Sequence, residues 1–371
     1  MLVQNQMQDT VKILGAGPAG LAAAITLARG GKQVLVIEQR DSVGARYNGN
    51  LQMLTNYPDR LDAREELKSL CDSDLPVLWP QHRARLFGPN GKRYEATSVE
   101  PFGYLLMRGP GSGSFDRSLY RSAERLGVQF EFGRRGDPDA VDIVATGGAR
   151  AQGVAREWHG PIDLPDGFHV RFDHETCPGG YGYLLVAGGK AVLGAAVVRE
   201  HKRIDAAFTD TAKWFHRRLG VPEIDTHSLV GSVDLFQIQT AVGLHSERYA
   251  GEAGGFCDGL FGFGIRTSLQ SGKIAATSIL TGESYDTLWR QHFGNRLETG
   301  LVNRFLYESG GNALLRGLLP VSGYRDFRTL GCSLSGKSVF RHMLLPVIRS
   351  AWRGVENSPH GPRSAWHRAV K

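Results

Sequence analysis

The chain has 371 residues, of which 41% are hydrophobic and 22% charged, a composition typical of a folded globular protein and not of a disordered one. Its four cysteines (Cys71, Cys177, Cys257 and Cys332) are scattered without a CxxC pair, which argues against a zinc site or a disulfide framework and favours a reducing compartment. The N-terminus lacks the pattern of a signal peptide and no run reaches the roughly 18 to 20 apolar residues of a membrane span, so a cytoplasmic location is expected.

The net charge of +7 is unevenly distributed. Residues 310–371 contain ten Lys and Arg against two acidic residues, a balance of +8, which leaves −1 for residues 1–309. The basic character therefore belongs to the tail. This distribution argues against a nucleic-acid-binding body.

The first predicted elements surround a glycine-rich turn in "TVKILGAGPAGLAAAITLARGGKQVLVIEQR", residues 10–40. The hydrophobic pattern predicts a strand, a helix and a second strand, over 11–14, 21–29 and 33–37. The turn "GAGPAG" has the GxGxxG spacing of a dinucleotide-binding loop. In such a loop Gly15 makes the turn, Gly17 lets the backbone approach a pyrophosphate, and Gly20 lets helix and strand pack closely.

Glu38 stands at the end of the second predicted strand, where a carboxylate can accept hydrogen bonds from ribose hydroxyls. A carboxylate at that place repels a 2′-phosphate, so the loop suits FAD or NAD and not NADP. The free N–H groups and the positive dipole end of the helix after Gly17 favour the phosphates of such a ligand.

The segments that follow favour FAD over NAD. An NAD dehydrogenase usually continues with further strand–helix units, whereas residues 41–58 are irregular and rich in Gly and Asn. A helix over 115–126 and a strand over 128–132 come next. The acid-led apolar strand in "DAVDIVATGG" (139–148) then ends at Thr146-Gly147.

Two later stretches also carry a pattern. "CPGGYGYLLVAGGKAVLGAAV" (177–197) predicts a pair of strands in which Tyr181 and Tyr183 face the same side. "AGEAGGFCDGLFGFGIRTSLQSGKIAA" (250–276) is a glycine-crowded run that leads into a helix predicted to begin near Ile265. Glycines concentrated before a helix are typical of backbone that passes close to a ligand.

Together these motifs resemble those of the FAD-dependent family with the p-hydroxybenzoate hydroxylase-type fold, and more narrowly of its geranylgeranyl reductase branch. The resemblance implies non-covalent FAD between the two glycine runs, with Arg108 at the flavin end. It implies that Glu252, in place of the usual aspartate, reaches the ribityl chain, and that the strands of 177–197 form part of the substrate cavity wall. The cofactor-binding residues expected are Gly15, Gly17, Pro18, Ala19, Gly20, Glu38, Gln39, Arg40, Arg46, Arg108, Thr146, Gly147, Gly251, Glu252, Gly262, Gly264 and Ile265.

The expected fold is α/β: a Rossmann-type FAD-binding domain interleaved with a mostly antiparallel β-sheet substrate domain, plus a helical C-terminal region. The FAD-binding domain is expected to comprise 1–60, 100–150 and 240–285. The substrate-binding domain would comprise 61–99 and 151–239, and 286–371 would form the helical, basic C-terminal region.

The expected reaction is hydride transfer at the flavin, paired with proton transfer by a tyrosine or water. Tyr181, Tyr183 and Cys257 are the candidate catalytic residues. By resemblance, the reaction reduces a C=C bond of a lipophilic, prenyl-type substrate. Dehydrogenation or monooxygenation of a small natural product, and a flavin-binding protein without redox turnover, are the alternatives. NAD(P)H or a reduced electron-carrier protein is the expected transient donor, because no dedicated NAD(P)H domain is evident.

The last predicted element is the stretch "SVFRHMLLPVIRSAW" (338–352), in which arginines fall mostly away from one apolar helical face. The residues predicted on that face are Phe340, Met343, Leu344, Val347, Ile348 and Trp352. Two interpretations stay open. One is a helix packed on the body, and the other is a basic amphipathic helix in peripheral contact with the inner face of an anionic membrane. Pro346 interrupts either helix.

Overall fold

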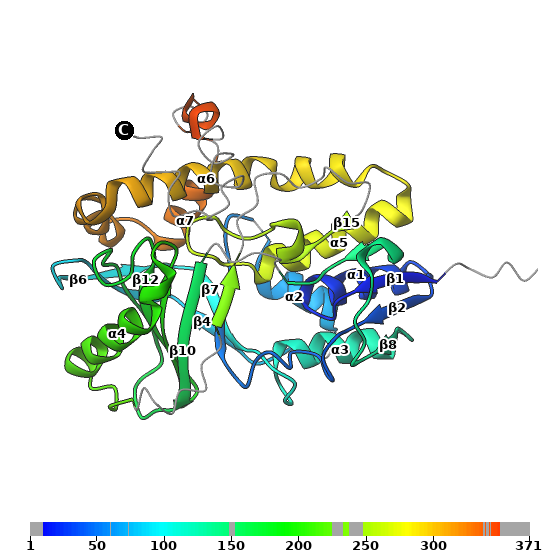
Figure 1. Cartoon of the computed structure of the whole chain (residues 1–371), viewed down its shortest axis with the longest axis horizontal. Helices are drawn as coiled ribbons and strands as arrows, with labels where there is room; N and C mark the ends of the chain where they lie inside the picture. Colours follow the sequence, from blue (N-terminus) through cyan, green and yellow to red (C-terminus); the bar gives the residue numbers. More distant parts are fainter. Residues whose placement is uncertain are drawn as a thin grey trace, which may run out of the picture.

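The computed structural model of the chain describes residues 10–59, 61–72, 74–147, 153–224, 233–236, 248–336, 338, 341 and 343–348. Three sheets follow one another along the molecule, and helices pack around them (Figure 1). The parallel sheet lies at one end, the largest sheet at the other, and the long helix α6 (Tyr285–Leu318) spans both. The expected α/β fold, with a Rossmann-type unit, a mostly antiparallel sheet and a helical C-terminal region, is confirmed.

The five-stranded sheet is parallel and follows the order β15-β9-β1-β2-β8. Its strands are β1 (Val11–Leu14), β2 (Val34–Ile37), β8 (Gln129–Glu131), β9 (Ile143–Val144) and β15 (Arg248–Tyr249). The helices of this half are α1 (Pro18–Arg29), α3 (Phe115–Arg125) and α5 (Ile265–Thr281). Since β15 pairs with β9, the second glycine-rich run follows a strand of the same sheet as the first, although it lies far along the chain.

Helices α1 and α5 pack closely because small residues form their contact. A Cβ at Gly272 of α5 would lie 2.0 Å from the backbone oxygen of Ala19 in α1. A Cβ at Gly251, before α5, would lie 2.9 Å from the Ala19 side chain. Glycine at both positions therefore holds the two glycine-rich runs next to each other.

The seven-stranded sheet follows the order β14-β10-β13-β12-β11-β5-β6, and only the β11–β5 pair is parallel. Its strands are β5 (Arg83–Phe87), β6 (Arg93–Thr97), β10 (Gly153–Pro161), β11 (Gly167–Arg171), β12 (Tyr181–Ala187), β13 (Lys190–Val197) and β14 (Val233–Phe236). Helix α4 (Ile204–Leu219) covers one face and buries Phe208 and Phe215. The opposite face lines the cavity described below.

A small antiparallel sheet of β3 (Leu51–Thr55), β7 (Gly103–Met107) and β4 (Leu78–Gln81) lies between the larger two (Figure 1). Successive side chains along its strands point to opposite faces, so each strand contributes residues to both hydrophobic cores. Leu54 and Leu106 belong to the core of the parallel half, whereas Met53 and Leu105 belong to the core beside the seven-stranded sheet. Helix α2 (Ala63–Cys71) follows β3. The domain boundaries expected from the sequence stay predictions.

The C-terminal region is helical. After α6, which is kinked at Gly311, come the short helix η4 (Leu319–Gly323) and α7 (Phe327–Ser335). The remaining short helices are η1 (Pro138–Ala140), η2 (His201–Arg203) and η3 (Gly251–Gly254). Among the helices that the structure describes, none is both long and apolar enough to cross a bilayer.

Residues 343–348 are helical and pack on α6. Leu345 and Ile348 are buried there, whereas Met343 and Val347 are 73% and 70% exposed. One face of the predicted amphipathic stretch thus docks on the body while another stays open to solvent. Residues 339, 340, 342 and 349–352 of that stretch, which include Phe340 and Trp352, lie outside the described residues.

Candidate functional site

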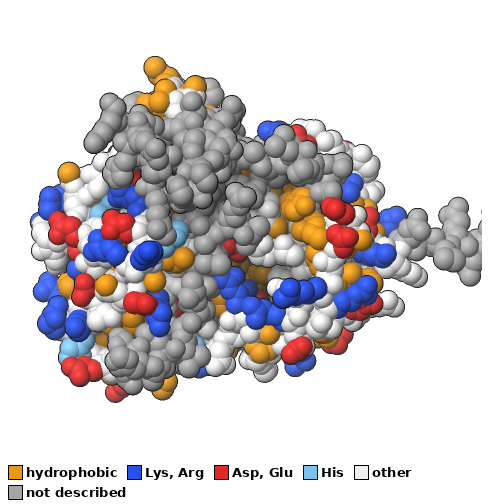
Figure 2. Space-filling model, viewed as in Figure 1, with side chains coloured by type: hydrophobic (Ala, Val, Ile, Leu, Met, Phe, Trp, Pro, Cys, Tyr) orange, Lys and Arg blue, Asp and Glu red, His pale blue; other side chains and the backbone are white. Residues whose placement is uncertain are grey.

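A cavity of about 840 Å³ lies between the parallel sheet and the seven-stranded sheet. Figure 2 shows a hollow on this face between the two halves, bordered by Lys and Arg side chains. Its volume is in the range of pockets that hold organic cofactors and ligands. The sequence-predicted site residues all line this cavity except Gly20. The structure therefore brings the two glycine-rich runs, Glu38, Arg108 and the two tyrosines together, and their roles stay predictions.

The first glycine loop is shaped by contacts that only glycine allows. Gly15 has a φ of +104°, and a Cβ there would lie 2.5 Å from the Ala145 backbone oxygen. A Cβ at Gly20 would lie 1.9 Å from the Gly15 oxygen, so Gly20 supports the loop from beneath and does not face the cavity. A Cβ at Gly17, by contrast, would meet no atom within 4 Å. That open space, at the N-terminus of α1, is where a pyrophosphate would lie.

Glu38 supports the same loop from the end of β2. Its Oε2 accepts a hydrogen bond from the Ala16 N–H at 2.8 Å, and its Oε1 accepts one from the Arg40 N–H at 2.9 Å. Gln39 and Arg40 continue the cavity lining beside it. The carboxylate is thus held at the cavity edge, in the place where a ribose hydroxyl could reach it.

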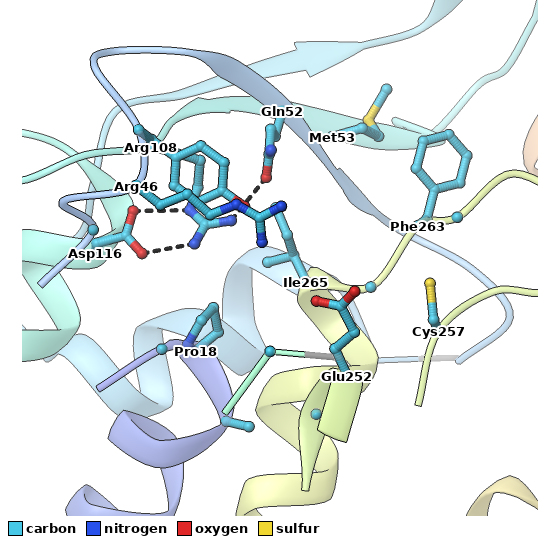
Figure 3. Close-up of a pocket in the computed structure, with 18 of the residues that line it drawn as sticks. Pro18, Arg46, Gln52, Met53, Arg108, Asp116, Glu252, Cys257, Phe263 and Ile265 are labelled. Carbon is cyan, nitrogen blue, oxygen red and sulfur yellow. Dashed lines mark hydrogen bonds and ion pairs between the residues drawn. The ribbon is translucent and has the colours of Figure 1, made fainter. Parts of the chain in front are cut away.

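Arg108 is a buried anchor of the cavity wall (Figure 3). Its Nε and Nη2 donate to the two carboxylate oxygens of Asp116 at 2.8 Å each, and its Nη1 donates to Gln52 at 2.7 Å. The guanidinium also lies 4.4 Å from the centre of the Tyr47 ring. Such a bidentate buried pair fixes the plane of the Arg108 guanidinium, so Arg108 shapes the cavity wall. Arg46 lies beside it and also lines the cavity.

The second glycine run forms the opposite wall. β15 leads into η3, where Gly251 has a φ of +63° and donates its N–H to Ser271 Oγ of α5 at 2.9 Å. Glu252 follows and points into the cavity, near Ile265 at the start of α5 (Figure 3). Gly262 adopts a positive φ of 78°, and Gly264 precedes the helix. The helix begins at Ile265 as predicted, with no acidic residue in its first turn to oppose a bound anion.

An ion network that the motifs did not indicate holds the start of α5. Arg266 is 2% exposed and donates from Nε to Glu66 Oε2 of α2 at 2.9 Å. Asp59 lies 3.6 Å from the same Nε and also pairs with Arg296 of α6. An arginine beside the positive end of a helix dipole is unfavourable alone, and the two carboxylates compensate for it. The network fixes α5 against α2 and α6.

The wall on the seven-stranded sheet is aromatic. Tyr181 and Tyr183 of β12 face the same side, as predicted, with ring centres 5.8 Å apart. The Tyr181 hydroxyl donates to the Phe261 backbone oxygen at 2.5 Å, which ties β12 to the second glycine run. Burial raises the pKa of Tyr181. The other aromatic residues of this wall are Phe102, Phe168, Phe172, Phe261, Phe263 and Phe327.

Cys257 lies in the second glycine run and lines the same cavity. Its side chain is buried, and burial, together with the nearby carboxylate of Glu252, raises the pKa of the thiol well above its usual value. A thiol with a raised pKa is a weak nucleophile. It can still act as a proton donor, so its assignment among the catalytic candidates stays a prediction.

Arg304 of α6 joins the second glycine run to the turn before β12. It is 1% exposed and donates to the Leu260 oxygen at 3.0 Å, to the Gly179 oxygen, and to Glu308 at 2.5 Å. The run also packs directly on α6, because a Cβ at Gly259 would lie 2.9 Å from the Gly300 backbone. No motif in the sequence pointed to Arg304.

Two further polar residues of this region belong to no motif in the sequence. Glu157 of β10 and Asn50, just before β3, are both buried, and Asn50 donates to Glu157 at 2.9 Å. The signal for Glu157 is a charge at an inward position of a strand, in "GVAREWH". The pairing itself spans 107 positions and has no local signature.

The residues of the cavity fit FAD. Open space above Gly17, two helix N-termini without acidic residues in their first turns, and Glu38 beyond β2 provide for the phosphates and the ribose. Gly262 and Gly264 leave room for a flat ring against the backbone. The aromatic wall faces that place from the other sheet.

Comparison with known proteins agrees with this geometry. The family model of the NAD(P)-binding Rossmann-like domain matches residues 13–52. The digeranylgeranylglycerophospholipid reductase of Methanosarcina acetivorans is 24% identical over 354 residues, covering 79% of this chain and 83% of its own. The digeranylgeranylglycerophospholipid reductase 2 of Methanopyrus kandleri is 23% identical, and the match covers 87% of this chain and 93% of that protein. A tryptophan 2-halogenase of Chondromyces crocatus is 28% identical, covering 62% and 40%.

Solved structures show the fold. A geranylgeranyl bacteriochlorophyll reductase-like protein of Thermoplasma acidophilum has a TM-score of 0.67 at 15% identity, covering 93% of this chain and 99% of its own. A flavin-dependent brominase variant has a TM-score of 0.60 at 16% identity, covering 94% and 99%. The chain thus has the fold shared by flavin-dependent reductases and halogenases. Within that class, its sequence is similar along most of its length to geranylgeranyl-type reductases, which confirms the resemblance drawn from the motifs.

Proposed function

We propose that the protein is an FAD-dependent oxidoreductase that reduces a carbon–carbon double bond in a lipophilic, prenyl-type substrate. One observation carries the proposal: a single cavity joins two dinucleotide-type glycine runs to an aromatic wall on a second sheet. The relatives described as digeranylgeranylglycerophospholipid reductases support the substrate class. The names of these relatives describe the reduction of a prenyl-bearing lipid, and we infer the same type of reaction for this protein.

When bound, reduced FAD supplies a hydride equivalent to one alkene carbon. The N-terminus of α1 would hold the phosphates of FAD, and Glu38 would accept hydrogen bonds from its ribose hydroxyls. The N-terminus of α5, at Ile265, would stabilise the negative charge that develops on the reduced ring, because the positive end of the helix dipole faces the cavity there. The aromatic wall, with Phe102 and Phe327 in edge-to-face contact at 4.9 Å, buries the hydrocarbon and excludes water.

The electron donor is NAD(P)H or a reduced electron-carrier protein in this proposal. The glycine loop of residues 15–20 is assigned to FAD, so a nicotinamide nucleotide would bind transiently at the cavity mouth. Exposed Arg40 and Arg135 line the cavity there and provide positive charge for such an anionic donor.

The test begins with the purified protein under nitrogen. Denaturation should release FAD, and NADH, NADPH or dithionite should bleach the bound flavin. Adding a geranylgeranyl lipid should restore the oxidised spectrum and yield a dihydro product by mass spectrometry, whereas the saturated lipid should not. A protein that neither carries nor takes up FAD would refute the proposal, as would reduced flavin that no alkene reoxidises.

The halogenase relative and the brominase structure favour one alternative, oxidation of a small natural product on the same scaffold. In that case the reduced flavin would consume oxygen in step with product formation, or the substrate itself would bleach the flavin. A flavin that exchanges electrons with none of these partners would indicate a flavin-binding protein without redox turnover.

Peripheral contact with an anionic membrane is the second part of the proposal. The exposed side chains of Met343 and Val347 and the basic tail support it. Deleting everything after residue 310 would also remove Leu315 and Leu319, which are buried in the body. The double variant Met343→Glu/Val347→Glu avoids this and should cosediment less with anionic vesicles. The control is Leu318→Glu, exposed at the end of α6, and equal binding by the double variant would refute the contact.

A further inference from the structure

A carboxyl group faces the cavity from the middle of a strand. Along β10, Ala155 and Glu157 line the cavity, while Arg156 points to the other face and pairs with Asp205 of α4. Glu157 is 4% exposed. Burying a carboxyl group in a wall of largely apolar side chains lowers the stability of the fold, so a buried glutamate at this position indicates a functional role.

A glycine on the intervening strand lets Tyr183 reach this carboxyl group. In the sheet register Gly194 of β13 is paired with Glu157 of β10 on one side and with Tyr183 of β12 on the other. The two side chains therefore start two strands apart, about 10 Å. A Cβ at Gly194 would lie 2.3 Å from the Tyr183 ring, so the ring lies directly across this strand. Its hydroxyl then meets Glu157 Oε1 at 2.5 Å.

The second oxygen of Glu157 is held from the opposite side. Asn50 Nδ2 donates to Oε2 at 2.9 Å, and Asn50 Oδ1 in turn accepts from the Asn48 N–H at 3.1 Å. Both Glu157 and Asn50 are buried. The carboxyl group is therefore fixed in one orientation, with one oxygen on the amide and the other on the tyrosine hydroxyl.

The neighbouring tyrosine is bonded differently. Tyr181 faces the same cavity but donates its hydroxyl proton to the Phe261 backbone oxygen, which cannot return a proton. Tyr183 instead shares a short hydrogen bond with an ionisable group, and either oxygen of that pair can hold the proton. Of the two tyrosines, only Tyr183 thus has a partner that can restore its proton among its described contacts.

We propose that Tyr183 and Glu157 form a proton relay that protonates the substrate carbon; this rests on the proposed function of alkene reduction. One alkene carbon takes the hydride equivalent, and the carbon–carbon π bond breaks. The other carbon takes the proton from Tyr183 Oη. The Tyr183 oxygen recovers a proton from the carboxylic acid form of Glu157, and solvent reprotonates Glu157 after the product leaves. The two electrons come from the NAD(P)H or carrier-protein donor through the flavin.

Single-turnover reoxidation of the dithionite-reduced protein by a geranylgeranyl lipid tests the relay. Glu157→Gln and Tyr183→Phe keep the shape of the wall and should each slow reoxidation by about 10²-fold, since general acid catalysis contributes that much. The double variant should be no slower than the slower single one, because the groups act in series. Tyr120→Phe is the matched control, because it removes a tyrosine–glutamate hydrogen bond, to Glu124, at a place outside the cavity lining, and it should reoxidise at the wild-type rate. Bound flavin and thermal unfolding, measured alongside, identify any variant that fails to fold.

The pH profile separates a relay from a merely structural pair. The wild-type rate should fall as pH rises and the pair loses its proton, whereas Glu157→Gln should be slow across the whole range. Relay variants that fold, bind flavin and reoxidise at the wild-type rate would overturn the relay while leaving alkene reduction in place.

Infrared difference spectra between low and high pH give a readout that needs no turnover. The folded protein should show a carboxylic acid band that Glu157→Gln removes and Tyr183→Phe shifts, because the hydrogen bond to the acid is lost. If the wild-type protein reduces no alkene, the proposed function fails first, and these spectra alone decide whether the pair carries a proton. A spectrum without a band assignable to Glu157 overturns the relay.

Discussion

Gly17→Ala tests whether the open space above the first glycine loop is a phosphate site. Gly17 lines the cavity with φ −81° and ψ −177°, backbone angles that alanine readily adopts. A Cβ there would meet no protein atom within 4 Å. The substitution should therefore leave the fold intact, and even stabilise it by about 0.4–1 kcal/mol through the unfolded chain.

The same methyl group should hinder the ligand. It stands where a pyrophosphate approaches the backbone N–H groups, and one charge-assisted hydrogen bond is worth about 1.5–3 kcal/mol. Losing one such bond weakens FAD binding by about 10- to 150-fold. The assay is a fluorescence titration of FAD into flavin-free protein, with thermal unfolding measured in parallel.

Two further glycines serve as controls. At Gly20 the Cβ would lie 1.9 Å from the Gly15 oxygen, so Gly20→Ala should destabilise the fold itself, by about 1–3 kcal/mol or more. Gly294 lies in α6, where a Cβ would meet no atom within 4 Å, so Gly294→Ala should lower neither the thermal stability nor the affinity for FAD. If Gly17→Ala binds FAD as tightly as the wild-type protein, the phosphate assignment is refuted.

Three other outcomes follow from the burial of charged and titratable groups. Arg266→Leu should lower the free energy of unfolding in urea by about 3–5 kcal/mol, because Glu66 is left buried without its main partner, and the double variant Arg266→Leu/Glu66→Leu should recover part of that loss. Burial, with a smaller contribution from Arg85, lowers the pKa of His169 from 6.5 to about 4. Between these two pKa values the unfolded chain binds more protons than the folded protein, so the free energy of unfolding should fall by up to about 3 kcal/mol as the pH drops through this window. His169→Gln should flatten that part of the stability–pH profile, which is measured by denaturation at several pH values. Burial raises the pKa of Cys177 to about 12, so alkylation followed by mass spectrometry should label this thiol only after unfolding, and labelling of the folded protein would contradict its burial.

Features with local signals were predicted closely. The strand over 11–14 is β1 within the same bounds, and α5 begins at Ile265 as expected. The strand pair within 177–197 places Tyr181 and Tyr183 on one face. In each case Gly, Pro or strict alternation acts over a few neighbouring residues, and such steric constraints can be recognised in a single sequence.

Features that depend on distant pairing were not predicted. Arg266 meets Glu66 across 200 positions, and Asn50 meets Glu157 across 107. Neither pair has a spacing rule, because the sheets and not the local chain bring these side chains together. The small sheet of β3, β7 and β4 also gave no advance signal, since its strands divide their side chains between two cores. The sequence did contain one local signal for this pair, which is a charged residue, Glu157, at an inward-facing position of a strand.

The buried guanidinium of Arg304 has a consequence for how the cavity is filled. Because it bonds to the Leu260 and Gly179 oxygens at once, α6 acts as a crossbar between the opposing walls. Moving those walls apart would remove the two carbonyl acceptors from the buried Arg304 guanidinium, at a cost of about 1.5–3 kcal/mol for each lost hydrogen bond. Under the proposed function, the hydrocarbon chain of the substrate would therefore enter a cavity whose walls are joined at Arg304, and the bulk of that chain, not a closing motion, would decide which lipids bind.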